Sequence, residues 1–207
     1  MRMLSAVAIA AAALIASTPR AEAQAAAGGP TTTPAGNNAA DVHFMSGMIP
    51  HHAQAVLIAG WAQSHGARKD IATLCERIVV AQQDEIRLMQ FWLREHGEPV
   101  PDAKATHMTM NMNGMQHDML MPGMLDSAQL ARLDKARGSE FDRLFLEAMI
   151  GHHEGAITMV DALFASKGAG NDDLVYRFAS DVYADQSTEI ERMTKMLASV
   201  PPSSPGK

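Results

Sequence analysis

Apolar residues recur every three or four positions through most of the chain beyond residue 40, which is the spacing of one face of an α-helix. Glycine and proline residues interrupt this pattern, and no segment alternates apolar and polar residues over a useful length. The pattern therefore predicts an all-α protein. The expected helices span about 41–66, 69–96, 126–137, 139–167 and 172–199, and Asp41 is the expected N-cap of the first.

The two halves of this pattern repeat one another. Residues 44–55 read FMSGMIPHHAQA, and residues 145–156 read FLEAMIGHHEGA. The helix that follows each motif also repeats, because residues 82–89 read QQDEIRLM and residues 186–193 read QSTEIERM. Each half is thus a predicted helical hairpin, and one hairpin alone cannot bury both sides of its apolar stripe. We expect the halves, 41–97 and 139–199, to close into a four-helix bundle covering 41–199.

The segments outside the two hairpins differ in character. Residues 98–125 form a Met-rich linker that is far longer than the usual connection of about 4–6 residues, and a short helix over 126–137 follows it. Residues 24–40 lack periodicity and read as a flexible leader, and residues 200–207 form a tail.

The first 23 residues have the pattern of a secretory signal peptide. Arg2 precedes an apolar run over residues 4–16, and Ala-Glu-Ala at residues 21–23 fits signal peptidase cleavage. The alternative is a membrane anchor, but the run is shorter than the roughly 20 residues that a spanning helix needs. We therefore expect an exported protein, periplasmic or secreted, with no membrane segment after cleavage.

The net charge and the cysteine content exclude some classes of function and one kind of cross-link. A formal net charge of −6 gives no electrostatic reason to bind nucleic acid or anionic lipid. The single cysteine, Cys75, excludes a disulfide within the chain, and its apolar neighbours at helical spacing predict a small buried side chain. The sequence does not indicate an oligomeric state.

The repeated motif places methionine beside histidine. On a helix, Met48 lies three and four residues before His51 and His52, so these side chains share one side, and Met45 extends that stripe. Adjacent histidines diverge by about 100°, so one of each pair should turn inward and the other toward a neighbouring helix or the surface. The second copy supplies Met149, His152 and His153.

A thioether beside an imidazole is a soft, neutral set of metal ligands. Thioethers favour Cu(I) and imidazole suits copper, whereas zinc sites use thiolate, imidazole or carboxylate. Each motif alone fits ordinary core methionine and a satisfied core histidine. Two matching copies together with the Met-rich linker favour a metal, and we expect copper as Cu(I).

The linker contains further candidates. Residues 107–124 read HMTMNMNGMQHDMLMPGM, and thioethers spaced along a polar backbone can wrap a soft ion. The alternatives are a linker with an exposed apolar patch or a sink for oxidants that forms methionine sulfoxide. The candidate ligands here are Met108, Met110, Met112, Met115, His117 and Met119, and His107 could contribute.

Two further pairs of positions repeat around the histidines. Pro50 and Gly151 directly precede the histidine pairs, and both residue types weaken a helix, so each indicates either a simple bend or a shaping of the site. Glu85 and Glu189 could accept the second ring N–H of a histidine and fix its tautomer. They could equally form surface salt bridges.

The motifs resemble those of the DUF305 family (domain of unknown function 305). The resemblance lies in DVHFMSGMIPHHAQAV at 41–56, MPGM at 121–124 and FDRLFLEAMIGHHEGAITM at 141–159. It implies a ferritin-like four-helix bundle and, as in the CopM-like periplasmic copper-binding proteins of the family, copper binding through Met and His in copper resistance. Many members have no assigned activity. By position, the implied ligands are Met45, Met48, His51, His52, Met149, His152 and His153, and His43 and the linker methionines match less closely.

The expected function is therefore a non-enzymatic exported copper binder that sequesters, buffers or hands over Cu(I). Its partners would be the copper ion and other periplasmic copper-handling proteins. One alternative is a metal oxidase on a ferritin-like bundle, but the Glu-x-x-His motif of di-iron bundles does not occur in the sequence. The other is a metal-independent helical interaction protein with an adaptable methionine surface.

Overall fold

The computed structural model describes residues 37–112 and 115–201. The predicted signal peptide, nearly all of the predicted leader and most of the predicted tail lie outside these residues. The described chain contains helices α1 (Ala39–Ala59), α2 (Lys69–Glu95), α3 (Ser127–Lys135), α4 (Ser139–Ala165) and α5 (Asp173–Ala198). It also contains strands β1 (Met108–Met112) and β2 (Met115–Met119). None of the described helices is long and apolar enough to cross a bilayer.

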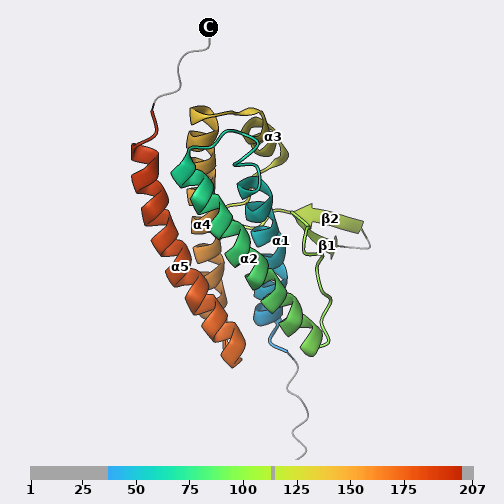
Figure 1. Ribbon diagram of the computed structural model, residues 1–207. Coiled ribbons are helices and arrows are strands. Elements are labelled where there is room, and N and C mark those ends of the chain that lie inside the picture. The colour runs from blue at the N-terminus through green and yellow to red at the C-terminus, as the bar shows by residue number, and fades with distance from the viewer. Residues whose placement is uncertain (1–36, 113–114, 202–207) are drawn as a thin grey trace, which may run out of the picture. The chain divides into compact units, whose positions relative to one another are not determined.

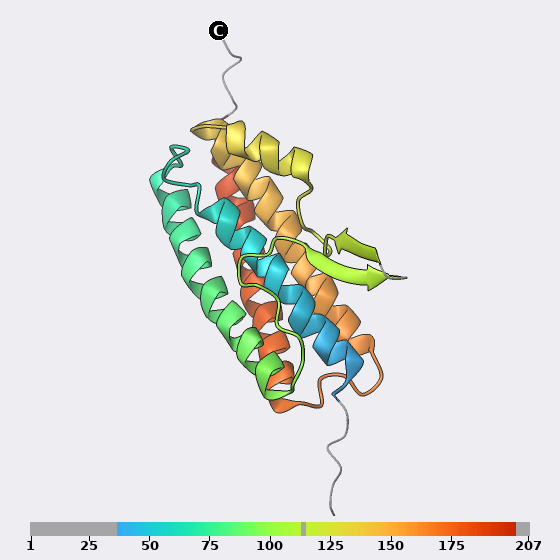
Figure 2. The ribbon, with the colours of Figure 1, turned by 90° about the vertical axis from the view of Figure 1, so that its right-hand side faces the viewer.

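The four long helices form two antiparallel hairpins that pack into a bundle, as the repeat predicts (Figure 1). The hairpins are α1–α2 and α4–α5, and α1 packs against α4 where they meet. The short α3 lies across one end of the bundle (Figure 2). The prediction of an all-α bundle made of two repeated hairpins is confirmed.

Local caps explain where several of these helices begin. The Asn38 side chain accepts a hydrogen bond from the amide of Ala40, so the N-cap of α1 lies three residues before the predicted Asp41. Asp126 and Gln129 form a capping box at α3, and the Asp172 side chain caps α5. Each cap accepts a backbone N–H that the first helical turn leaves unpaired.

The predicted extension of the first helix to residue 66 is wrong. The α-helix ends at Ala59, and successive turns carry the chain to Gly66, which adopts a left-handed φ of 70°. One helix-type hydrogen bond persists in these turns, because the backbone N–H of His65 donates to the carbonyl of Trp61, four residues earlier. The apolar spacing therefore continues past the end of the regular helix. α1 itself runs through Pro50 without interruption.

The prediction that no segment forms a strand is also wrong. Residues 108–112 and 115–119 pair as an antiparallel hairpin, with Met108 opposite Met119 and Met112 opposite Met115. The hairpin projects from the side of the bundle (Figure 2). The sequence Met-Thr-Met-Asn-Met alternates over five residues, and the Asn-Gly dipeptide that follows is typical of hairpin turns. Each run of alternation covers only five residues in an otherwise helical chain, which is a weak signal for a strand.

The two halves are tied together by reciprocal hydrogen bonds. Buried Asp41 of α1 accepts from the amide of Gly170 at 2.7 Å, in the loop between α4 and α5. Buried Asp142 of α4 accepts from the amide of Arg68 at 3.1 Å, in the loop between α1 and α2. Each half therefore supplies a buried carboxylate that caps the loop of the other half.

The linker segment Met121–Met124 packs directly on α4. A side chain at Gly123 would meet the backbone of α4, with the Gly151 carbonyl oxygen 2.5 Å from the added Cβ. A Cβ at Gly155 would overlap the carbonyl group of Pro122. This close approach explains why glycine occupies both positions.

The change Gly155→Ala should lower the free energy of unfolding by about 1–3 kcal/mol, because the added methyl must displace linker backbone. At Gly151, also in α4, an added Cβ meets nothing within 4 Å. Gly151→Ala should therefore stabilise the protein by roughly 0.5–1 kcal/mol through helix propensity. Urea denaturation of both variants measures the difference, and equal stabilities would contradict the packing of the linker on α4.

Candidate metal centre

Four histidines form a buried layer at the middle of the bundle. His51 and His52 lie on α1, His152 and His153 lie on α4, and all four are 0% exposed. The rings of His51 and His152 meet between the two helices, with centroids 3.8 Å apart. We use the name histidine layer for these four residues.

The histidine layer separates two apolar clusters. On α1 one cluster extends as far as Ala53 and the other starts at Ala55. On α4 the second cluster ends at Met149 and the first resumes at Ala156. Four polar side chains therefore interrupt a core that is otherwise continuous, which is costly unless their polar atoms find partners.

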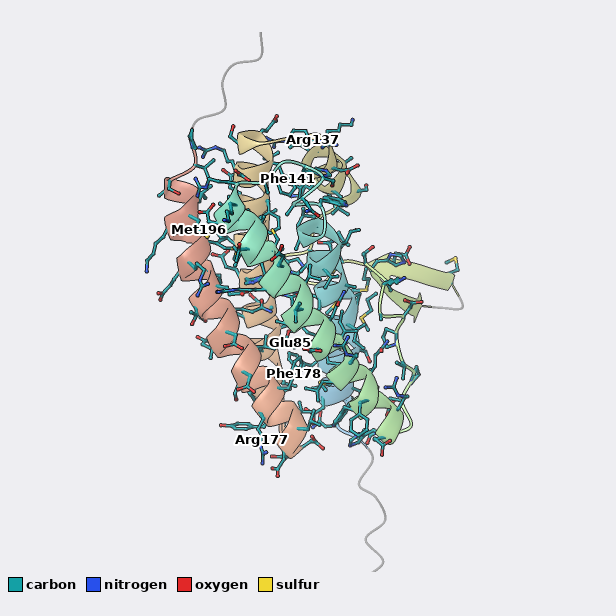
Figure 3. All side chains as sticks on the ribbon, in the orientation of Figure 1. Glu85, Arg137, Phe141, Arg177, Phe178 and Met196 are labelled. Atoms are coloured by element: carbon teal, nitrogen blue, oxygen red, sulfur yellow. The ribbon has the colours of Figure 1, made fainter. Side chains whose placement is uncertain are left out.

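Within the layer, two histidines face carboxylates on the outer helices. His153 Nε2 lies 2.7 Å from Glu189 Oε2 of α5 and donates a hydrogen bond to it. His52 Nε2 lies 2.7 Å from Glu85 Oε2 of α2, although its angle falls short of a good hydrogen bond. Glu85 lies midway along α2 (Figure 3). The matching contacts follow from the matching sequences of the two halves.

The other two histidines face one another and the linker. His51 Nε2 lies 3.0 Å from the carbonyl oxygen of Pro122, to which it donates when that nitrogen carries the proton. His152 has no hydrogen-bond partner for either ring nitrogen in the described part of the chain. Burial, and then the neighbouring imidazole, lowers the pKa of both His51 and His152 well below the ordinary value of histidine. Both rings are therefore neutral at neutral pH.

Buried nitrogen atoms without partners collect in this layer. They are the Nδ1 atoms of all four histidines and the Nε2 atom of His152, in addition to the poorly aligned His52 Nε2. Buried polar atoms without a partner are rare, and each costs about 1–3 kcal/mol. A neutral imidazole that donates from Nε2 keeps a free lone pair on Nδ1, and that lone pair can bind a metal ion.

Thioethers lie on both sides of the histidine layer. Met45 and Met48 are fully buried in the first apolar cluster, and Met149 is fully buried in the second. Within the described residues, no group of three or more His, Cys, Asp and Glu side chains is arranged to hold a metal ion. Methionine lies outside that set of residue types. Cys75 offers no thiolate, because burial raises the pKa of its thiol to about 12.

Solvent reaches the carboxylate side of the layer through a groove between α2 and α5. A cavity of about 220 Å³ there is lined by Glu85, Glu189, Gln82 and Gln186, among others. Glu85 and Glu189 are 23% and 28% exposed, while the histidines that they contact are fully buried. Burial, and then the neighbouring Glu85, raises the pKa of Asp185 on the same groove. Arg77 and Arg192 line the same groove, so acidic and basic side chains both border it beside the imidazoles.

The remaining predicted ligands lie outside the histidine layer. His43 is exposed on α1, and Met115 and Met119 are exposed on β2. Met108 is half-buried and packs against the first apolar cluster. Met110, Met112 and His117 lie on the hairpin strands, with Met110 opposite His117.

Three further buried methionines lie near the layer, and the repeated motif and the Met-rich linker contain them, although they are not among the predicted ligands. Met121 and Met124 lie in the linker segment that covers α4, and Met159 lies on α4. The signal was present, since Met121 and Met124 bracket the Pro-Gly turn and Met159 ends the second repeated segment. Their proximity depends on the folded path of the linker, which no local pattern gives.

Comparison with known proteins places this fold. The sequence profile described as Domain of unknown function (DUF305) matches residues 41–197. The solved structure of a DUF305 protein from Streptomyces coelicolor has a TM-score of 0.65 and 24% identity, over 81% of this chain and 98% of its own. A DUF305 fragment from Deinococcus radiodurans has a TM-score of 0.64 and 25% identity, over 78% of this chain and 97% of its own.

Copper-bound structures are among the similar ones. CopM in its Cu(II)-bound form is 27% identical with a TM-score of 0.59, over 77% of this chain and 96% of its own. CopM has also been solved in Cu(I)-bound, silver-bound and apo forms. No protein with a curated description matches the chain.

Proposed function

This chain belongs to the DUF305 family, and from that premise we propose that it is an exported copper-binding protein that sequesters, buffers or hands over Cu(I). The role would be copper tolerance or homeostasis, with the copper ion as cargo and other copper-handling proteins as partners. Export is supported by the signal-peptide pattern of residues 1–23. The similarity to copper- and silver-bound CopM supports the choice of metal.

One observation carries the proposal: a buried layer of four histidines with unpartnered ring nitrogens, flanked by buried thioethers. Imidazole nitrogen and thioether sulfur are both neutral, so a Cu(I) ion bound by them keeps a single net charge in the core. Soft ligands of this kind favour Cu(I) over zinc, magnesium and calcium. The proposed ligands are His51, His52, His152 and His153 with Met45, Met48 and Met149.

The carboxylates and the hairpin have supporting roles in this proposal. Glu189 accepts a hydrogen bond from Nε2 of His153, and Glu85 lies 2.7 Å from Nε2 of His52, so Nδ1 of both rings is left for copper. The groove between α2 and α5, which Glu85 and Glu189 line together with Arg77 and Arg192, admits the ion. On the hairpin, Met115 and Met119 are exposed and offer a weaker set of thioethers that captures copper from solution. No step of this function is a chemical reaction, so the protein acts as a binder.

Anaerobic competition with a coloured Cu(I) chelator tests the function. The purified chain, without its signal peptide, should withdraw Cu(I) from the chelator at micromolar protein concentration, and Zn²⁺ should not displace the bound copper. Absence of competition at that concentration would exclude the proposed function.

The change Glu85→Gln together with Glu189→Gln should weaken Cu(I) binding by about 10–100-fold, because the tautomer of His52 and His153 is then no longer fixed. Asp84→Asn is the matched control, since Asp84 lies on α2 beside Glu85 but pairs with exposed Arg87. The same competition titration measures all three affinities. Equal affinity in the double variant and the control would show that the two glutamates do not assist binding.

A further inference from the structure

A second group of soft ligands lines a separate cavity at the edge of the first apolar cluster. This cavity of about 200 Å³ is bordered by α1, α4 and the linker. Each of the three segments contributes one side chain that can bind a soft metal: His43, Met159 and Met121 respectively. None of the four histidines of the histidine layer lines it.

The ends of the Met121 and Met159 side chains converge over Gly47 of α1. A Cβ built at Gly47 would lie 3.3 Å from Met121 Sδ and 3.5 Å from the terminal methyl of Met159. The two side chains therefore meet at one point on the helix surface. His43 lies one turn before Gly47 on the same face of α1, so its imidazole borders the same space.

Burial and charge at this cavity suit a soft monovalent ion. Met121 is 7% and Met159 is 6% exposed, while His43 is exposed and has no hydrogen-bond partner within the described residues. No carboxylate lines the cavity, and most of its lining is apolar. Zinc, calcium and magnesium favour sites with charged or oxygen ligands, whereas two thioethers and one imidazole favour Cu(I) and its analogue Ag(I).

We propose that His43, Met121 and Met159 form a second binding site for a soft monovalent metal ion, at the surface between α1, α4 and the linker. It is distinct from the histidine layer and does not require that layer to bind copper. The two places are adjacent in the chain, because Met121 precedes Pro122, whose carbonyl contacts His51. The exposed imidazole lets the ion enter from solvent, and the two buried thioethers hold it.

Silver titration of the full mature chain, with methionine methyl groups labelled for NMR, tests this site. Ag(I) should shift the methyl signals of Met121 and Met159. The double variant Met121→Leu/Met159→Leu, which conserves volume, should bind one molar equivalent less than the wild type. Met193→Leu is the matched control, because Met193 is a buried methionine of the second apolar cluster. Equal silver stoichiometry in the double variant and the control would overturn the proposal.

A second variant moves the Met121 side chain out of place but leaves all three proposed ligands in the sequence. In Gly47→Ala the new methyl would lie 2.7 Å from the terminal methyl of Met121, so that flexible side chain must move aside. Alanine also favours the helix, so the fold is retained. The affinity of this site for Ag(I) should fall severalfold, with the stoichiometry of the histidine layer unchanged. An unchanged affinity would contradict the proposed position of Met121.

The test separates this site from the proposed function. If only the histidine layer binds metal, the variants at Met121, Met159 and Gly47 behave as the wild type. If only the surface site binds, the double variant Met121→Leu/Met159→Leu loses all silver binding. Wild-type protein that binds no Ag(I) at all would overturn both proposals.

Discussion

Replacing His52 and His153 together by alanine should weaken Cu(I) binding by the histidine layer at least about 100-fold, or roughly 2.8 kcal/mol. Both imidazoles are fully buried, and the Nδ1 atom of each has no hydrogen-bond partner within the described residues. Alanine removes two of the four proposed nitrogen ligands and offers nothing in their place. Anaerobic competition titration against a Cu(I) chelator measures the loss.

His65→Ala provides the matched control for this loss. His65 is also buried, but its Nε2 lies 2.9 Å from the carbonyl oxygen of Asp134, well outside the histidine layer. The control loses a buried imidazole and should keep the wild-type affinity for Cu(I). Circular dichroism at 222 nm checks that both variants remain helical. Wild-type affinity in a folded His52→Ala/His153→Ala variant would show that copper does not bind in the histidine layer.

The metal-free protein should lose stability as the pH falls below about 6.5, the ordinary pKa of histidine. Burial, reinforced by the neighbouring imidazoles, holds the pKa of His51 and His152 well below this value in the folded state. Below pH 6.5 the unfolded chain binds a proton at each residue, whereas the folded chain does not. The unfolded state therefore gains stability until the pH reaches the folded pKa values.

The expected slope follows from proton linkage. Each histidine that is protonated only in the unfolded state contributes about 1.4 kcal/mol per pH unit, so the two together approach about 2.7 kcal/mol per unit. Asp142 and Asp185 have raised pKa values in the folded protein, so their protonation at lower pH favours the folded state and partly offsets this loss of stability. Urea denaturation between pH 7.5 and 5.5, flanking the ordinary histidine pKa of about 6.5, measures the slope.

NMR titration of the ring resonances checks the cause. The resonances of His51 and His152 should titrate near pH 6.5 only in the denatured protein. Titration near 6.5 in the folded protein would contradict their burial as neutral groups.

Much of this architecture follows from the sequence because the helical repeats are long and occur twice. The spacing of Ile71, Leu74 and Ile78 predicts the buried face of α2. The duplicated Met-Ile-x-His-His motifs predict equivalent positions in two hairpins, and the structure brings these motifs together at the contact of α1 and α4. The match between QQDEIRLM and QSTEIERM places Glu85 and Glu189 at corresponding turns of α2 and α5.

Other features of the site depend on tertiary packing that no local pattern encodes. The sequence leaves open whether the second ring of each pair faces a neighbouring helix or water, and His52 and His153 are buried because α2 and α5 cover them. The contact of His51 with Pro122 spans 71 residues and depends on the path of the linker. The linker backbone passes so close to Gly155 that only glycine fits there, but the sequence alone does not show which segment makes this contact.

The central claim is that Cu(I) binds in the histidine layer through imidazole and thioether ligands. Anomalous diffraction at the copper edge, from crystals of the mature chain loaded anaerobically with Cu(I), tests it most directly. The claim predicts an anomalous peak between α1 and α4, within bonding distance of histidine nitrogen atoms from both motifs and of Met48 or Met149. Copper found only on the hairpin or the surface, with the histidine layer empty, would contradict it.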